Sequence, residues 1–453
     1  MSIELKALVG EALRWIESRK IPGLEAELYV SRSEERSIER RDGKPDEIAN
    51  ASAEGVGLRL LSGGRMGFAS AGGLSLATVQ GLFDRILTEL PHLSPDPLRA
   101  FPVKGERALV DDAKISETLW DDSLFTESWD QIVPRLEKLE AQVRAGDKRI
   151  SSVLRAGYSE NRGEVVVANS SGVTAWERGA SASVGVSAMA EDDGELQVGS
   201  AFDSQRRKSA LDFDRVGREA AERTVALLGA AKMPGGRRSV VFDPWVSGEF
   251  LELIAQLLCA DQVQRGKSLL SGKLGATVGS ALATFIDDPR RPGGLASSLF
   301  DDEGCPTIKK VAIEAGVVKE FFYDTYTAAR DRVKSNASAG RGSYKGLPGP
   351  GCSNFYLAPG KTSRDALIGS TKDGILILEV MGMHMADPIS GEFSVGVSGL
   401  AIQDGKLGRP VKNAMISGNL LELLSGIDAV ADDLAFHGSL GAPTFRVAAL
   451  AMA

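Results

Sequence analysis

Apolar residues recur at helical spacing in several stretches of the chain. Each stretch predicts an amphipathic helix with one apolar stripe. Pro22-Gly23 ends the first of these patterns, and Pro134 lies near the first turn of another, where a proline is tolerated. The predicted helices are Ile3–Lys20, Leu74–Leu90, Trp129–Ala145, Asp212–Leu228 and, approximately, Val246–Cys259.

Short apolar runs between glycines predict strands. In the first hundred residues, Glu25–Val30 alternates between apolar and polar positions, and the charged segment Ser31–Arg41 is compatible with a solvated continuation of the same strand. Gly55-Val-Gly-Leu-Arg-Leu-Leu and Ser62-Gly-Gly-Arg-Met-Gly-Phe-Ala-Ser predict two strands joined by a glycine-rich turn. Further predicted strands are Ile150–Asn161, Glu164–Asn169, Gly172–Met189, Ser239–Phe242, Gly374–Met381, Phe393–Ile402 and Phe445–Leu450.

Two segments without such periodicity divide the chain. His92–Lys104 is rich in proline and polar residues, and Lys232-Met-Pro-Gly-Gly-Arg-Arg is the clearest boundary. They predict an α+β protein with an αβ unit over residues 1–103, a second αβ unit over 104–235, and a β-rich domain over 236–453.

Composition favours a soluble protein of the cytoplasm. The net charge is −8, which argues against a surface that coats nucleic acid. The three cysteines are widely spaced, with no CxxC pair, so a disulfide framework is not expected. The N-terminal residues lack the pattern of a signal peptide, and no apolar run approaches the roughly 20 residues that span a bilayer.

The residues alone reveal no complete catalytic motif. Only three histidines occur, His92, His384 and His437, and no two are spaced as a zinc-binding pair on one helix turn. A GxSxG nucleophile elbow is absent. Gly266-Lys-Ser and Gly360-Lys-Thr keep only the end of a phosphate-binding loop, because the upstream glycine is missing from both.

Several segments taken together resemble the TldD/PmbA family, known as modulators of gyrase and as peptidase components. Each fragment is weak alone, but their order and spacing extend over some four hundred residues. The resemblance implies a multi-domain fold with a β-rich C-terminal domain. The fragments are Gly55-Val-Gly-Leu-Arg, Gly63-Gly-Arg-Met-Gly-Phe-Ala-Ser, Phe300-Asp-Asp-Glu-Gly, Glu314-Ala-Gly-Val-Val-Lys, Gly374-Ile-Leu-Ile, Ser390-Gly-Glu-Phe-Ser-Val-Gly-Val-Ser-Gly and Ile416-Ser-Gly-Asn-Leu.

The zinc motif of that family is degenerate in this sequence. In the TldD branch a HExxxH helix binds zinc, and a cysteine near the C-terminus completes the site. Counted back from the landmark Ser271-Gly-Lys-Leu-Gly, the two histidine positions hold Leu251 and Gln256, and only Glu252 survives. The Cys-Gly pair is replaced by His437-Gly438. Leucine offers no ligand atom, and an amide is a poor ligand for Zn²⁺.

This departure resembles the TldE/PmbA branch. It implies a subunit without a catalytic site or cofactor of its own, in a cytoplasmic metallopeptidase that cleaves unfolded or leader peptides. A TldD-type partner would supply the zinc, and the chain alone would form a homodimer. Glu252 would then be an ordinary surface or salt-bridged carboxylate. Two alternatives stay open: a regulatory, gyrase-modulator type of binding protein, and a stand-alone peptidase with a metal site around Glu252, His384 and His437.

Overall fold

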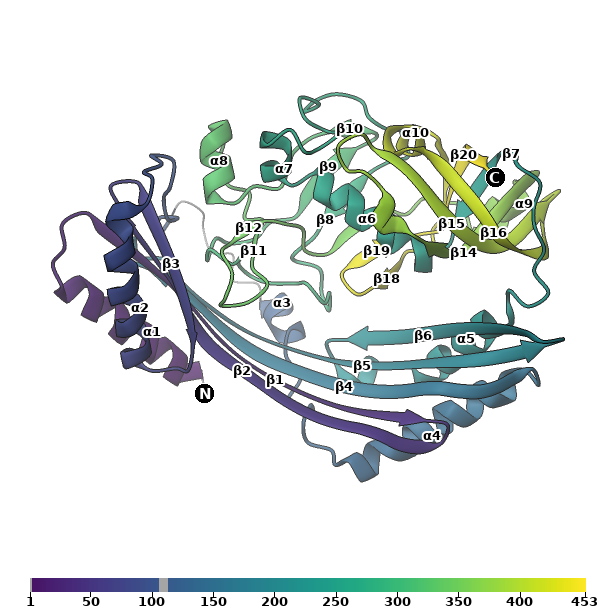
Figure 1. Ribbon diagram of the computed structural model, residues 1–453, viewed down its shortest axis with the longest axis horizontal. Coiled ribbons are helices and arrows are strands. Elements are labelled where there is room, and N and C mark those ends of the chain that lie inside the picture. Colours follow the sequence, from purple (N-terminus) through teal and green to yellow (C-terminus); the bar gives the residue numbers. More distant parts are fainter. Residues whose placement is uncertain (1, 106–112) are drawn as a thin grey trace.

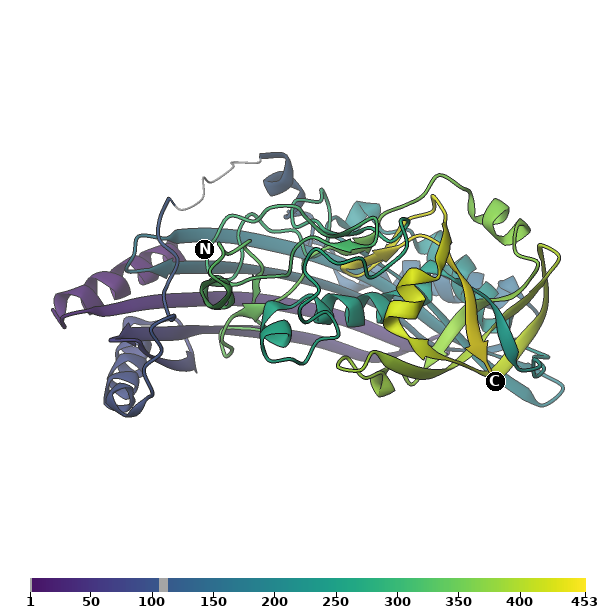
Figure 2. The ribbon, with the colours of Figure 1, turned by 90° about the horizontal axis from the view of Figure 1, so that it is seen from above.

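The computed structural model describes residues 2–105 and 113–453. The N-terminal half of the chain forms a long curved sheet, and the C-terminal domain lies on its concave face (Figure 1). Seen from above, the strands of this sheet run lengthwise beneath the C-terminal domain (Figure 2). None of the helices in these residues combines the length and the apolar composition needed to cross a lipid bilayer.

In the described part of the chain, the long sheet has six antiparallel strands. β1 and β4 pair at its centre, with Glu27 opposite Asn169, so strands from both predicted N-terminal units share one sheet. At about 3.3 Å per residue, the longest strand extends roughly 65 Å. In spatial order the strands are β3 (Arg65–Gly72), β2 (Lys44–Ser62), β1 (Leu24–Arg41), β4 (Ile150–Asn169), β5 (Thr174–Asp192) and β6 (Glu195–Gln205).

Two-residue turns close three hairpins of this sheet. Both residues have positive φ in Asp42-Gly43, Gly63-Gly64 and Asp193-Gly194, for example 47° and 80° in the last pair. Such turns match the twist of the flanking strands, and they favour glycine and aspartate because other side chains are strained at positive φ. These local pairs therefore fix where β1, β2 and β5 end.

Among residues 2–105 and 113–453, four helices cover the convex face of the sheet. Alternate residues of β1, such as Leu28 and Ile38, point toward this helical layer, whereas Tyr29 points toward the C-terminal domain. The first helix packs on β1 and β4 and the second on β2 and β3. The last two pack side by side, one on β4 and the other on β5 and β6. The helices are α1 (Ser2–Ser18), α2 (Leu76–Glu89), α4 (Trp129–Gly146) and α5 (Phe213–Val225).

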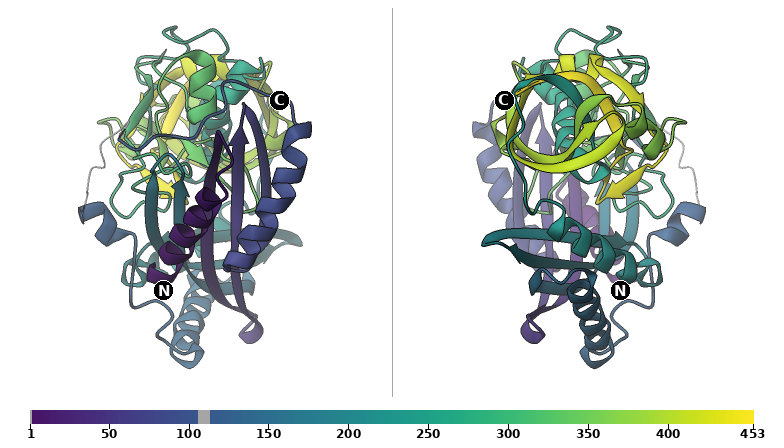
Figure 3. Two further views of the ribbon diagram at one scale, coloured as in Figure 1. Left: turned by 90° about the vertical axis from the view of Figure 1, so that its left-hand side faces the viewer. Right: turned by 90° about the vertical axis from the view of Figure 1, so that its right-hand side faces the viewer.

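The C-terminal domain is built around a small barrel, which appears as a ring in the right-hand view of Figure 3. A direct pairing of β16 with β20 closes it, through Ile416 and Met452. β17 (Ile427–Val430) adds to β20. The barrel strands are β7 (Gly236–Phe242), β14 (Asp373–Met381), β15 (Glu392–Gln403), β16 (Lys406–Asn419) and β20 (Phe445–Met452).

A second sheet of short strands completes this domain. Helix α6 (Pro244–Leu257) packs between it and the barrel, in the largest apolar core of the described residues. The strands are β10 (Val317–Val318), β9 (Lys310–Glu314), β8 (Phe285–Asp287), β13 (Phe355–Leu357), β19 (Leu440–Ala442) and β18 (Ala435–His437). Shorter elements are α3 (Ala113–Thr118), α7 (Ala260–Gln264), α8 (Thr325–Asp331), α9 (Arg364–Gly369), α10 (Leu420–Ser425), β11 (Ala339–Gly340), β12 (Gly349–Pro350), η1 (Leu90–His92), η2 (Lys208–Ala210) and η3 (Met383–Met385).

The α+β prediction is confirmed, and so is the charged continuation of β1. Opposite charges pair across β1 and β4 there: Arg36 donates to Glu160 at 2.7 Å, and Arg162 donates to Glu34 at 2.7 Å. The sequence prediction is wrong in dividing β4 at Arg162, because these same pairs continue the strand. It also omits β6 entirely.

Buried ion pairs join the C-terminal domain to the long sheet. We call the set Glu27, Arg59, Glu303 and Arg341 the buried junction. Arg59 donates to Glu27 at 2.8 Å and to Glu303 at 3.2 Å, and Arg341 also pairs with Glu27. Burial opposes ionisation of Glu27, but Arg59 and Arg341 outweigh it and hold the pKa of that carboxyl below its usual value. The junction thereby fixes how the two halves of the chain sit together.

Candidate functional site

Helix α6 carries the positions of the degenerate motif. Asp243 caps its start by accepting a hydrogen bond from the Trp245 backbone N–H at 3.0 Å, and Pro244 occupies the first turn. Leu251 lies in the apolar core with 3% exposure. Glu252 and Gln256, four residues apart, share the exposed face of the helix.

The two histidine positions of the motif hold none of the side chains that usually bind zinc. Leu251 has no atom that binds a metal, and the described residues contain no group of three His, Cys, Asp or Glu side chains arranged to hold an ion. Cys259 and Cys352 lie near one another, but burial raises the pKa of both thiols to about 12. A thiol that stays protonated is a poor ligand and a poor nucleophile.

His437 lies at the end of β18, far along the chain from α6, and reaches the first turn of that helix. Its ring meets Trp245 edge to face at 4.9 Å between centroids, and Phe202 of β6 at 5.9 Å. Burial, and then the nearby Arg223 guanidinium, lower the pKa of His437 to about 4. The imidazole is therefore neutral at pH 7 and can donate one hydrogen bond and accept another.

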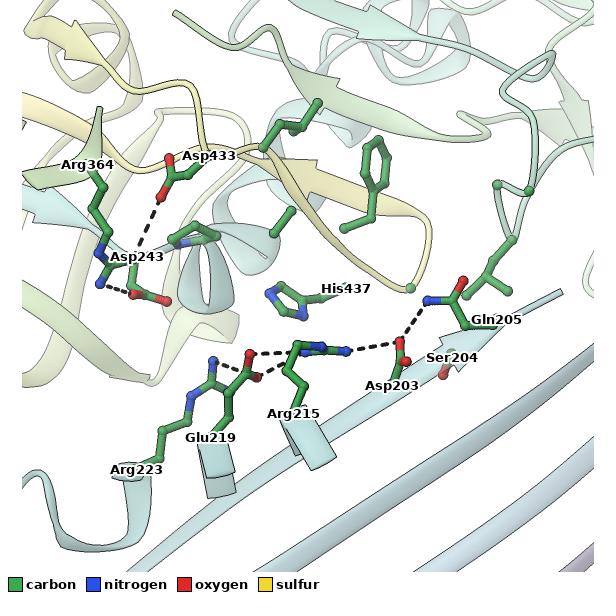
Figure 4. Close-up of a pocket in the computed structure, with 18 of the residues that line it drawn as sticks. Asp203, Ser204, Gln205, Arg215, Glu219, Arg223, Asp243, Arg364, Asp433 and His437 are labelled. Carbon is green, nitrogen blue, oxygen red and sulfur yellow. Dashed lines mark hydrogen bonds and ion pairs between the residues drawn. The ribbon is translucent and has the colours of Figure 1, made fainter. Parts of the chain in front are cut away.

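His437 points into a cavity of about 790 Å³ at the free edge of β6 (Figure 4). One wall comes from β6 and α5 of the N-terminal half. The other comes from the start of α6, from α9, and from the loops beside β8 and β18 in the C-terminal domain. The cavity therefore lies between the two halves of the chain, and we call it the edge cavity.

Two arginine-centred clusters line the edge cavity. Arg364 pairs with Asp243 at 2.7 Å and lies 3.8 Å from Asp433. Arg215 pairs with Asp203 and Glu219, each at 3.1 Å. In Figure 4, His437 lies between the cluster of Arg364 and the cluster of Arg215.

The structure does not bring the motif positions together in this cavity. Of α6, only Pro244 lines it, while Glu252 and Gln256 face elsewhere. His384 lies on the exposed segment η3, after β14. The metal site around Glu252, His384 and His437, left open by the sequence, is therefore not supported, because these side chains form no ligand group among the described residues.

Sequence reasoning missed the charged residues of the edge cavity. Arg215 and Glu219 sit one turn apart on a predicted helix and read as a surface ion pair. Arg291 and Arg364 lie in segments without a clear pattern. Asp243-Pro244 was the available signal, since an aspartate before a proline marks a helix start, but it does not indicate a cavity.

Three domain models of one family match most of the chain. They are the PmbA/TldA metallopeptidase domain 1 over residues 26–87, the central domain over 122–228 and the C-terminal domain over 235–453. The chain therefore belongs to the PmbA/TldD family of metallopeptidase-like proteins.

Three relatives match over nearly their whole length. Metalloprotease MJ0996 of Methanocaldococcus jannaschii is 27% identical over 92% of this chain and 91% of its own. A Thermotoga maritima structure, named as a modulator of a DNA gyrase, has a TM-score of 0.89 at 26% identity and covers 99% of this chain and 100% of its own. TldE from Thermococcus kodakarensis has the same fold, with a TM-score of 0.88 at 22% identity over 98% of this chain and all of its own.

Proposed function

We propose that this chain is the TldE/PmbA-type subunit of a cytoplasmic zinc metallopeptidase complex that cleaves unfolded or leader peptides. The observation that carries the proposal is the chemistry of α6. The first ligand position holds Leu251, a core side chain, and the second holds Gln256 on the exposed face. A zinc site in this helix would need a metal-binding side chain at position 251, where the fold has a buried leucine.

In this proposal a TldD-type subunit supplies the zinc ligands and the glutamate that activates water. The present chain supplies an enclosing wall. Its long sheet ends in β6, an edge strand, and an extended peptide can pair with such an edge through main-chain hydrogen bonds. The edge cavity opens beside the same strand.

An exposed apolar surface on the barrel supports docking of that partner. Met381 of β14 and Met415 of β16 flank Gly396 of β15, and they are 51% and 45% exposed. Met385 nearby is 71% exposed. The apolar runs Gly374–Met381 and Phe393–Ile402, predicted from the sequence as strands, mostly fill the barrel beneath these methionines. Flexible methionines suit an interface that accepts either a related subunit or a second copy.

A regulatory binding role is the second candidate. It is favoured by the Thermotoga maritima relative that is named as a modulator of a DNA gyrase. The net charge of −8 disfavours direct contact with DNA and is compatible with a protein target.

Mixing the purified chain with a HExxxH-bearing family member tests the proposal. Light scattering should show a homodimer alone and a heteromer in the mixture, and peptide hydrolysis should appear only in the mixture. Glu252→Gln should leave that hydrolysis within about twofold, whereas the same change at the partner's motif glutamate should lower it by roughly 10²–10⁴-fold, the usual contribution of a general base.

Two outcomes would contradict the proposal. One is stoichiometric zinc with chelator-sensitive peptidase activity in this chain alone. The other is a chain that ignores the partner at micromolar concentration, which would favour the regulatory role instead.

A further inference from the structure

Four of the five carboxylates that line the edge cavity pair with arginines of the same chain. Asp203 and Glu219 pair with Arg215, and Asp243 and Asp433 lie against Arg364. A fifth, Glu222, is exposed to solvent on α5. Two further arginines, Arg223 and Arg291, line the same cavity without an equivalent partner.

Arg291 is held by an aromatic ring rather than by an anion. Its guanidinium carbon lies 4.0 Å from the centroid of the Phe436 ring, and no ion pair involves this side chain among the described residues. The preceding Arg290 is a contrast, since it donates to Thr307 at 2.9 Å and to the Leu299 carbonyl at 2.9 Å. A guanidinium stacked on a ring keeps the N–H groups of its edge available, in the geometry that a carboxylate accepts.

Arg223 reaches the cavity from α5 in a similar way. Its guanidinium carbon lies 3.8 Å from the centroid of the Trp245 ring, and its nearest carboxylate, Glu219, is also 3.8 Å away and engaged with Arg215. Burial lowers the pKa of Arg223 despite the acidic groups nearby. The charge is therefore desolvated without full compensation, which an added anion would relieve.

Part of the wall is apolar, although Ser204, Gln205 and His437 line it as well. Pro244, Leu295, Leu378 and Leu434 line the cavity together with Phe436. Its volume of about 790 Å³ falls within the range of roughly 300–1,000 Å³ typical of ligand sites. A ligand that fits both features carries a carboxylate next to an apolar side chain.

We propose that the edge cavity binds a peptide through a carboxylate that pairs with Arg291, with Arg223 as the second cation and the apolar wall holding a neighbouring side chain. The peptide as carrier rests on the proposed function, whereas the preference for a carboxylate rests on the cavity itself. The carboxylate has two possible sources, a peptide C-terminus or an acidic side chain.

Isothermal titration calorimetry of unlabelled, N-acetylated hexapeptides with the isolated full chain distinguishes these sources. One peptide ends in leucine as a free acid, the second is the same peptide as an amide, and the third is the amide with a glutamate beside the leucine. We expect the first or the third to bind about 10-fold tighter than the plain amide, the effect of one charge-assisted pair. A tighter first peptide identifies the C-terminus, and a tighter third identifies the side chain.

Substitutions connect that preference to the cavity. Arg291→Gln should reduce binding of the carboxylate peptide to the level of the amide, and Arg291→Lys should keep part of the preference. Arg85→Gln, on exposed α2 and far from the cavity, is the matched control and should bind as wild type does. Melting temperatures establish that each variant is folded, and Arg223→Gln, on another element, replaces Arg291→Gln should the latter not fold.

Equal binding of all three peptides to the wild-type chain would overturn the inference, as would full carboxylate preference in folded Arg291→Gln. The measurement needs no zinc-bearing partner and no hydrolysis. A chain that binds carboxylate peptides but ignores the partner would therefore contradict the proposed function alone.

Discussion

The buried junction and the edge cavity both lie where the C-terminal domain meets the long sheet, and both gather arginines and carboxylates. In the junction, Glu27 and Arg341 have side chains with 0% exposure, and Arg59 bridges two carboxylates. In the edge cavity, the arginine side chains of both clusters keep about a third of their surface exposed, at 31% for Arg215 and 34% for Arg364.

This difference separates two uses of the same residue types. A closed set of buried charges tolerates no change of partner, because each unpaired charge would remain without water. The charged residues of the edge cavity are partly exposed, and two of its arginines stack on aromatic rings, so their N–H groups can still bind a ligand. The junction is therefore structural, and the cavity is the place to look for binding.

The largest effect is expected at the junction. Arg59→Gln leaves Glu303 buried without its cation and Glu27 with Arg341 alone, so we expect a loss of about 3–5 kcal/mol in the free energy of unfolding. Urea denaturation measures it. Arg59→Lys keeps the charge without the planar fork and should lose less, and Arg85→Gln on the surface of α2 should lose almost nothing. If Arg59→Gln lowered the free energy of unfolding as little as Arg85→Gln does, the buried junction would not be more important for stability than the edge cavity.

An intermediate effect is expected from His437, and it depends on pH. The pKa of this imidazole is near 6.5 in the unfolded chain and near 4 in the folded chain, where it lies beside Arg215, Glu219 and Arg223 of α5 and beside Asp243, which caps α6. Stability present above pH 6.5 is therefore lost as the pH falls toward 4, by on the order of 1–2 kcal/mol after solvent screening. His437→Asn should flatten this part of the curve of unfolding free energy against pH.

His92→Asn is the control for this experiment, because His92 is exposed at the end of η1. It measures how the loss of an exposed histidine changes the dependence of the unfolding free energy on pH. An acid limb that is identical in wild type and His437→Asn would show that the buried imidazole is not what makes the fold sensitive to acid.

The smallest effect is expected within the cavity's own ion pairs. Arg215→Gln should cost about 0–1 kcal/mol, because the pairs are partly solvated and Asp203 keeps hydrogen bonds from Gln205 and the Asp212 backbone at 2.9 Å. Thermal unfolding of Arg215→Gln and Arg59→Gln compares the stability lost in the edge cavity with that lost in the buried junction, for the same type of substitution. Similar losses of stability in the two variants would show that the ion pairs of the cavity are structural, as those of the junction are.

The sequence predicted the parts of the fold that depend on local pattern. Helical periodicity located α4 and α6, and the glycine-rich turn located β2 and β3. β6 was missed although Asp193-Gly194 is a strong hairpin signal, because Leu196 and Val198 face the open side of an edge strand rather than a core.

The site was predictable only in part, for a different reason. Leu251 and Gln256 could be read from the motif, because six consecutive positions on one helix suffice. The edge cavity could not, since Arg223 and Arg291 come from α5 and a loop of the C-terminal domain and meet through the way the two halves of the chain dock. No spacing in the sequence indicates that these two arginines line the same cavity.

The pairing of β1 with β4 has a consequence for synthesis of the chain. The turn at Asp42-Gly43 lets β1 and β2 pair as soon as they emerge, but β4 follows roughly a hundred residues later, about 5–20 s at ribosomal rates. During that interval one side of β1 is an unprotected strand edge. Its outer half, Ser31–Arg41, is dense in arginine and glutamate, which discourages pairing with other nascent chains. The charged residues that later pair with β4 therefore reduce aggregation through β1 while the rest of the chain is being translated.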